Sequence, residues 1–267
     1  MKRLEAVIFD WAGTTVDHGS RAPVRAVIEL FHLHGVSLSD ADARKDMGIF
    51  KRDHIRNILA MPKVSERWRE LTGAVPNEHG VSKLFSDFQP LQMRILEECS
   101  QVIEGMPALA VKLRSRDLRI GSTTGYTRPM LDVLVNQAKA QGYHSDLALC
   151  PDDAPGGRPR PWMCLQLAIH FQLSATFAAV KIGDTISDIE EALNAGMWAV
   201  GVAATGNEIG LSAADFAALS QDERSKRIAA ARDRLRAAGA HYVVDSAACC
   251  EPVLDEIDSR LATGDRP

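Results

Sequence analysis

The chain has 267 residues, which is enough for one large α/β domain with a smaller inserted domain. Hydrophobic residues make up 46% and charged residues 25%, as is usual for a water-soluble globular protein. The net charge of −4 gives no indication of nucleic-acid or membrane-surface binding. The apolar run in MKRLEAVIFDWAG is too short for a signal peptide or a spanning helix, so we expect a cytoplasmic protein without nucleic-acid or membrane partners.

The first predicted element is a buried strand, Glu5–Phe9, a short apolar run that ends at Asp10. From about residue 20 to residue 99 the sequence has helical periodicity and almost no strand signal. This helical block predicts a cap domain over residues 20–99, with residues 1–19 and 100–267 forming the core. The predicted cap helices are Pro23–Gly35, Ala41–Met61 (with Ser39 and Asp40 as candidate caps), Ser65–Thr72 and Ser82–Ser100.

Strands and helices alternate after residue 100, which predicts a doubly wound parallel sheet, that is, a Rossmann-like α/β core with helices on both faces. Ligands bind such sheets at the carboxyl ends of the strands. Asp10, Thr124 and Asp184 each follow a predicted strand end, so we expect them to meet there. The predicted strands are Leu118–Ser122, Leu147–Cys150, Ala178–Ile182, Trp198–Ala203 and His241–Val244, and the helices are Met106–Arg116, Ser187–Ala195 and Ser212–Ala238.

Three strand ends carry polar motifs that suit a phosphate and a hard cation. The first, DWAGTTVD, begins at Asp10 and offers a carboxylate, backbone N–H groups and hydroxyls. The second, GSTTGY, offers the hydroxyl of Thr124. The third, GDTISD, sets Asp184 and Asp188 four residues apart, and two carboxylates with a substrate oxygen suffice for Mg²⁺. Each motif has a structural alternative: the first could be a plain turn, and Asp184 could cap a helix.

In these motifs the sequence resembles the haloacid dehalogenase superfamily, whose first motif is Asp-x-x-Gly-Thr, followed by a Ser/Thr motif and an acidic Gly-Asp motif. The resemblance covers the whole chain, including a helical cap after the first motif. It implies that Asp10 is the nucleophile, forming an aspartyl-phosphate, and that Thr124 binds phosphate. It also implies a Mg²⁺ site made by Asp10, the backbone carbonyl of Ala12 and Asp184, with Asp188 supporting the metal shell or its waters.

Position 12 departs from the pattern of this superfamily's phosphatases. They usually carry an Asp there, which protonates the departing oxygen, whereas the methyl group of Ala12 cannot donate a proton. Dehalogenases also lack that acid, but they typically have an aromatic residue at the position. Ala12 therefore indicates either an inactive protein or a leaving group that does not need the acid.

The predicted helix Ala41–Met61 offers a substitute for the missing acid. Met47, Lys51 and His54 are spaced to share one face of that helix. The Lys51 amine can condense with a carbonyl to an imine, an electron sink that lets a carbon–phosphorus bond break. We expect His54 to move protons, and we expect the pKa of Lys51 to be lowered by burial or by the nearby cations Arg44, Lys45 and Arg52. Taken alone, such a helix face is more often a solvated surface.

Longer segments are similar to the phosphonoacetaldehyde hydrolase family, namely DWAGTTVD, ARKDMGIFKRDH, GSTTGYTR, PDDAPGGRPRPWMC and GDTISDIEEALNAGMW. This resemblance covers nearly the full length. It implies that Lys51 forms a Schiff base with the aldehyde of a small phosphonate substrate, with Met47 and His54 near the amine. It places Gly125 and Tyr126 beside the substrate, and it implies a homodimer formed through the cap domain.

Arg158, in the segment GGRPRPW, falls where the superfamily often has a Lys. We expect it to pair with the phosphoryl group and the Asp10 carboxylate, although Arg160 is close in sequence and a loop surface charge is the alternative. Ser20 stands in the hinge region after the first motif, where relatives can have a Cys, and we expect this change to tune activity only.

Two other functions stay open at this point. The first is a phosphate-ester phosphatase that takes its acid from the cap. The second is a catalytically silent binding member, since one motif carboxylate is missing. The presence of Asp10, Asp184, Asp188, Arg158 and Lys51 argues against the silent protein.

Overall fold

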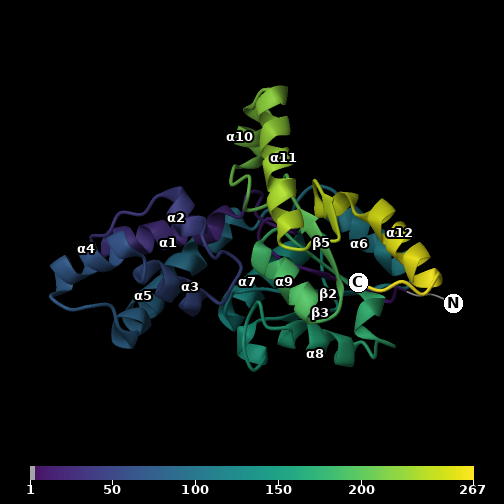
Figure 1. Cartoon of the computed structure of the whole chain (residues 1–267), viewed down its shortest axis with the longest axis horizontal. Helices are drawn as coiled ribbons and strands as arrows, with labels where there is room; N and C mark the ends of the chain where they lie inside the picture. Colours follow the sequence, from purple (N-terminus) through teal and green to yellow (C-terminus); the bar gives the residue numbers. More distant parts are fainter. Residues whose placement is uncertain (1–3) are drawn as a thin grey trace.

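The computed structural model describes residues 4–267 and contains an α/β core with a set of helices beside it (Figure 1). Six parallel strands form one sheet in the order β3-β2-β1-β4-β5-β6. This order confirms the predicted doubly wound sheet, and each observed bound lies within one residue of the predicted one. The strands are β1 (Ala6–Phe9), β2 (Arg119–Thr123), β3 (Leu147–Leu149), β4 (Ala179–Gly183), β5 (Trp198–Val202) and β6 (Tyr242–Val244).

Helices cover both faces of the sheet because successive side chains of a strand point to opposite faces. Ala6 and Ile8 of β1 pack in one apolar cluster with α8, and Val7 and Phe9 pack in another with α6, α7 and α12. Helices α9 and α11 complete the first face over β5. The bounds are α6 (Met106–Ser115), α7 (Arg128–Ala140), α8 (Trp162–His170), α9 (Ile186–Asn194), α11 (Gln221–Ala237) and α12 (Glu251–Ala262).

The predicted single helix Ser212–Ala238 is wrong. The structure has two helices, α10 (Ala213–Ala218) and α11, which project together from the body at the top of Figure 1. Ser220 interrupts them because its side chain caps α11, accepting a hydrogen bond from the backbone N–H of Glu223 at 3.2 Å.

Five helices fill the interval between β1 and α6 and lie on the left of Figure 1. Helix α5 packs against both α1 and α3, and it also packs against α7, so the apolar residues of these helices continue the cluster on one face of the sheet. We continue to treat residues 20–99 as the proposed cap domain. Within residues 4–267, no helix is both long and apolar enough to cross a membrane. The five helices are α1 (Arg21–Leu33), α2 (Asp40–Arg44), α3 (Lys51–Leu59), α4 (Pro62–Thr72) and α5 (Glu78–Cys99).

The predicted continuous helix Ala41–Met61 is also wrong, because α2 ends at Arg44 and α3 begins at Lys51. Between them lies a turn, which we call the cap loop (residues 45–50). Asp46 and Gly48 have φ of 57° and 92° in this loop, and a right-handed helix cannot contain such angles. Met47 therefore lies in the cap loop, whereas Lys51 and His54 lie on α3.

Candidate active site

The site lies where the strand order reverses. The chain runs from β1 outward to β2 and β3 and then returns to β4 on the other side of β1. A crevice forms at the carboxyl ends of strands at such a point. Asp10 follows β1 there, and its backbone N–H donates to the carbonyl of Ile182 in β4 at 2.9 Å. Asp184 follows β4, so the fold brings together two carboxylates 174 positions apart in the chain.

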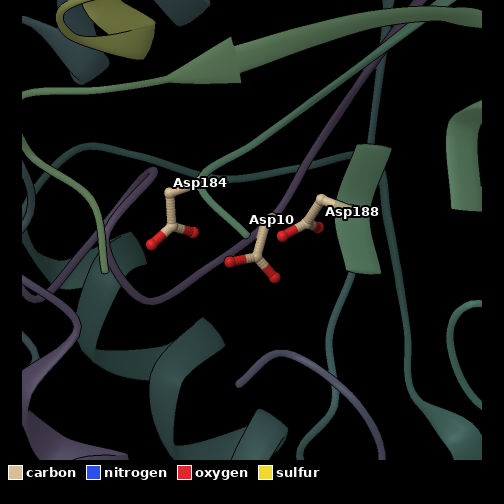
Figure 2. A group of neighbouring side chains, drawn as sticks. All are labelled: Asp10, Asp184 and Asp188. Atoms are coloured by element: carbon tan, nitrogen blue, oxygen red, sulfur yellow. The ribbon is translucent and has the colours of Figure 1, made fainter. Parts of the chain in front are cut away.

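Asp10, Asp184 and Asp188 form one buried cluster in which an oxygen of each carboxylate lies within 4.8 Å of the others. Figure 2 shows Asp10 between the other two. Burial, together with the charges of Asp10 and Asp188, raises the pKa of Asp184 well above its usual value. Burial and the charge of Asp188 also raise the pKa of Asp10. Hard oxygen donors whose charges repel one another fit a divalent cation. The cluster is therefore able to bind a metal ion.

Both oxygens of Asp188 already have protein partners. Lys181 Nζ lies 2.7 Å and Arg158 Nη1 2.8 Å from Asp188 Oδ1, and the Thr185 hydroxyl donates to Oδ2 at 2.5 Å. Burial by itself would raise the pKa of Asp188, but the two cations and these hydrogen bonds outweigh it and lower the pKa. Thr185, rather than Asp184, caps helix α9. The helix-cap alternative for Asp184 is therefore wrong, and Asp188 is better suited to support a metal site than to bind the ion alone.

Arg158 is buried beneath this cluster, whereas Arg160 is exposed. Arg158 Nη1 lies 2.7 Å from Asp10 Oδ1, so the expected pairing with the Asp10 carboxylate is present. Its Nε lies 2.9 Å from Glu191 Oε2, and its Nη2 donates to the Thr123 carbonyl at 2.6 Å. These contacts fix the plane of the guanidinium group and direct one edge toward Asp10.

Sequence reasoning missed Lys181 and Glu191 as parts of the site. Lys181 is a charged residue inside a buried strand, and Glu191 follows Asp188 by one helical turn on α9. Both are buried, and Thr123 Oγ1 also donates to Glu191 at 2.9 Å. Buried charged residues are rare unless they are paired, so the charge within an apolar strand was a usable signal for Lys181.

Lys51 enters the site from the proposed cap, at the first turn of α3. Its side chain is buried, with Nζ 3.4 Å from Met47 Sδ and 5.5 Å from the centre of the Tyr126 ring. Burial lowers the pKa of Lys51 to about 8, and the charge of Arg158 adds to that effect. Of the two expected causes, burial or neighbouring cap cations, burial is therefore the larger. Arg44 pairs with Asp40 and Arg52 pairs with Glu78.

His54 lies behind Lys51 on α3 and is fully buried. Within the described part of the chain, neither ring nitrogen has a hydrogen-bond partner of normal geometry. Burial, and then the charge of Lys51, lowers the pKa of His54 to about 3. The imidazole is therefore neutral at physiological pH.

Core and cap residues share one small cavity of about 20 Å³. That volume has room for a single water molecule. It is lined by Asp10, Ala12, Ser20, Pro23, Met47, Gly48, Lys51, Thr124, Gly125, Tyr126, Arg158 and Thr185. The structure thus unites most of the predicted site residues, while His54, Asp184 and Asp188 lie outside the cavity lining. A ligand larger than one water molecule would require the cap loop to move away from the core.

The cap loop approaches the core closely at glycines. A Cβ atom at Gly125 would lie 2.4 Å from the carbonyl oxygen of Ile49, and one at Gly48 would lie 2.3 Å from Thr185 Oγ1. The Ser187 hydroxyl donates to the Met47 carbonyl at 3.1 Å. Glycine is needed where two backbones meet this closely, so Gly125 has a packing role that its sequence motif did not reveal.

Known proteins resemble this chain in sequence and in structure. The family model for haloacid dehalogenase-like hydrolases matches residues 4–196. The chain is 44% identical to phosphonoacetaldehyde hydrolases from Nitratidesulfovibrio vulgaris (99% of this chain, 94% of the relative) and Paraburkholderia phytofirmans (100% of both). It superposes on the crystal structure of a phosphonoacetaldehyde hydrolase-like protein from Oleispira antarctica with a TM-score of 0.98 and 41% identity, covering 99% of this chain and 96% of that one.

Proposed function

This chain belongs to the haloacid dehalogenase-like hydrolases and, within them, to the phosphonoacetaldehyde hydrolases, and from that membership we propose that it hydrolyses phosphonoacetaldehyde to acetaldehyde and phosphate. One observation carries the mechanism: a buried amine, Lys51, and a buried carboxylate, Asp10, line the same cavity. Ala12 supplies no acid for a leaving oxygen, and a carbon leaving group stabilised through an imine needs none.

The first step is imine formation. The neutral Lys51 amine attacks the aldehyde carbon, and loss of water leaves a protonated C=N bond. A pKa of about 8 leaves a useful neutral fraction of the amine at physiological pH. Because His54 is neutral and lies one helical turn after Lys51 on α3, we assign it the transfer of protons in this step.

The second step breaks the carbon–phosphorus bond. A carboxylate oxygen of Asp10 bonds to phosphorus, and the bonding pair of the C–P bond moves into the imine, giving an enamine on Lys51. Arg158 faces Asp10 and stabilises negative charge on the phosphoryl oxygens. Thr124 and Gly125 line the cavity and contact the substrate from the second motif.

Water completes the reaction. Protonation of the enamine carbon restores an imine, whose hydrolysis releases acetaldehyde and frees Lys51. Hydrolysis of the aspartyl-phosphate releases phosphate and restores Asp10. In the closed form, Met47 and Tyr126 flank the amine and exclude bulk water until the cap opens.

The metal site of this proposal is made by Asp10, Asp184 and the backbone carbonyl of Ala12, with Mg²⁺ as the ion. Thr14 Oγ1 donates to Asp184 Oδ1 at 3.1 Å and the backbone N–H of Asn207 donates to Oδ2 at 2.7 Å, which hold that carboxylate in place. A bound Mg²⁺ supplies positive charge that offsets the carboxylates and the phosphoryl oxygens.

Borohydride trapping tests the imine. Protein treated with phosphonoacetaldehyde and borohydride is expected to gain the mass of a reduced adduct, which peptide mapping places on Lys51. Lys51→Arg should abolish both the adduct and turnover, because the guanidinium stays protonated. Lys63→Arg, at an exposed cap lysine, serves as the control and should retain both.

Phosphate release without an adduct would overturn the imine and favour the phosphate-ester phosphatase. Neither adduct nor phosphate release would favour the silent binding protein, against which family membership argues.

A homodimer formed through the cap is part of the same proposal, and a cytoplasmic location stays a prediction. Leu33 on α1 and Leu71 on α4 are exposed apolar residues of the proposed cap. Sedimentation of the wild type and Leu33→Glu tests the dimer: a monomeric wild type would contradict it, and a variant that dissociates would support the cap interface.

A further inference from the structure

Arg44, the last residue of α2, bonds to three separate segments of the chain. Its Nε lies 2.6 Å from Asp40 Oδ2 in its own helix. Its Nη1 donates to the carbonyl of Gly19 at 3.0 Å, in the linker that leads from the core into the proposed cap. The same nitrogen lies 3.1 Å from Asn207 Oδ1, and Nη2 donates to the carbonyl of Gly210 at 3.0 Å, both in the core. The guanidinium therefore joins the cap, the linker and the core.

The core partner of Arg44 is a loop after β5, which we call the core loop (residues 205–210). This loop is attached to the catalytic end of the sheet at two points. The Thr205 hydroxyl donates to the carbonyl of Gly13 at 2.7 Å, and the backbone N–H of Asn207 donates to Asp184 Oδ2 at 2.7 Å. Asn207 thus links Arg44 to the Asp184 carboxylate of the proposed metal site.

The junction is shaped for the guanidinium. Gly210 has a φ of 70°, and a Cβ there would lie 2.7 Å from Arg44 Nε and 2.8 Å from its Cζ. The backbone N–H of Gly19 also donates to the Thr205 carbonyl at 2.7 Å, so the linker and the core loop are in contact beneath the guanidinium. Several acceptors converge on one planar cation, an arrangement that arginine can satisfy and lysine cannot.

We propose that Arg44 is the clasp that holds the cap closed, a positioning residue whose bonds to Gly19, Asn207 and Gly210 must break before substrate enters. The closed form described here leaves only about 20 Å³ around Lys51 and Asp10, so an open form has to exist. Arg44 and Asn207 also line a cleft of about 760 Å³ between cap and core. Breaking the clasp widens that cleft, and re-forming it returns Lys51 to Asp10. The effect of closure on catalysis rests on the proposed function, because closure is what brings Lys51 and Asp10 together around the substrate.

Another cap arginine provides a matched control. Arg56, on α3, pairs with Asp53 and Glu78, both of which belong to the cap. Arg56 thus has two acidic partners where Arg44 has one, but both of them move with the cap, so closure does not affect these ion pairs. Arg56→Met therefore removes a cap arginine without removing a bond between cap and core.

The test compares wild type, Arg44→Met, Arg44→Lys and Arg56→Met by hydrogen exchange and by kinetics. Peptides covering the cap loop are followed by mass spectrometry in protein without substrate. We expect Arg44→Met to exchange there at least about tenfold faster than the wild type, because it loses the charge-assisted hydrogen bonds to the linker and the core loop. Its kcat/KM for phosphonoacetaldehyde should fall about tenfold or more, with KM raised. Arg44→Lys should show an intermediate exchange rate, and Arg56→Met should match the wild type.

The two readouts separate this proposal from the proposed function. Exchange is measured without substrate, so faster exchange in Arg44→Met supports the clasp even if the protein turned over a different substrate. Exchange within twofold of wild type would overturn the clasp, whatever happens to activity. Full recovery of slow exchange by Arg44→Lys would also overturn it, because a single ammonium group cannot bridge the linker and the core loop.

Discussion

Arg158 Nη1 lies 2.7 Å from Asp10 Oδ1, and this contact joins the proposed nucleophile to a buried network of opposite charges. The same guanidinium contacts Asp188 and Glu191 within 2.9 Å. Asp10 is thereby held in one orientation before any substrate arrives, which is the arrangement that an in-line attack on phosphorus needs.

Arg158→Met should destabilise the protein. Removing one partner from a buried charge network typically costs about 3–5 kcal/mol, because the remaining carboxylates lose their counter-charge. Urea unfolding without added metal measures the change. Arg160→Met, two positions away and exposed, should stay within about 0.5 kcal/mol of the wild type. Equal stability for the two variants would contradict the structural role of Arg158.

Arg158→Lys tests geometry separately from charge. An ammonium group cannot reproduce the fork of contacts with Asp10, Glu191 and the Thr123 carbonyl, so kcat should fall by about 100-fold or more. Steady-state kinetics measures this loss. Near wild-type turnover would mean that a positive charge alone suffices at this position.

The activity should rise with pH through about 8, because only the neutral Lys51 amine attacks the aldehyde and its pKa is about 8. The measurement is the pH profile of kcat/KM between pH 6 and pH 10. A rate that is flat from pH 6 to pH 9 would show that deprotonation of Lys51 does not control the reaction.

Burying Lys51 should also lower the stability of the protein at neutral pH. Its pKa falls from 10.5 to about 8 on folding, so below pH 8 the folded state carries the full cost of a buried charge, about 3 kcal/mol. Between pH 8 and pH 10.5 the unfolded chain keeps the proton that the folded protein has lost, and stability rises with pH. Lys51→Met should therefore be more stable than the wild type at pH 7 by about 2–3 kcal/mol. Chemical unfolding of both proteins at pH 7 and at pH 10 measures this difference in stability, which should be smaller at pH 10.

Gly125→Ala should impair closure of the cap. The added methyl group would meet the backbone oxygens of Ile49 and Gly48 at 2.4 and 2.7 Å, and backbone cannot yield as a flexible side chain can. We expect kcat/KM to fall at least about tenfold. Gly73→Ala is the control: it has open space, and its φ of 75° costs about 1 kcal/mol of stability without touching the site. Unchanged kinetics in Gly125→Ala would refute the close docking of the cap loop.

Mg²⁺ should stabilise the protein more at pH 7 than at pH 5. The folded state raises the pKa of Asp184 well above 3.8, so without metal its contribution to stability is complete below about pH 4 and is lost as pH rises through the raised value. A cation reverses this loss and competes with protons for the same oxygens. Thermal unfolding with Mg²⁺ or with a chelator measures the shift, and Asp184→Asn should remove most of it. A shift equal at both pH values would exclude Asp184 as a ligand.

The strands and the motifs could be predicted from the sequence, because both depend on local pattern. Short apolar runs between helical segments located all six strands to within one residue. The sequence motifs indicated Asp10, Lys51 and Arg158 as candidate site residues. The prediction of one continuous helix failed within the proposed cap, where the chain turns at Gly48 and Met47 is separated from the helix that carries Lys51. The pattern of residues 41–61 is compatible with a helix throughout, and docking of the cap loop against Thr185 and Ser187 favours the turn.

Which charged residues meet could not be predicted from the sequence. Lys181 and Glu191 pair with the site because a strand and a helix pack side by side, and Arg44 reaches Asn207 across 163 positions of chain. The pKa of Lys51 likewise depends chiefly on burial, and no local pattern of neighbouring cations could give it. Hydrophobic periodicity is a property of a few consecutive residues, whereas desolvation and ion pairing arise only when distant segments are packed together.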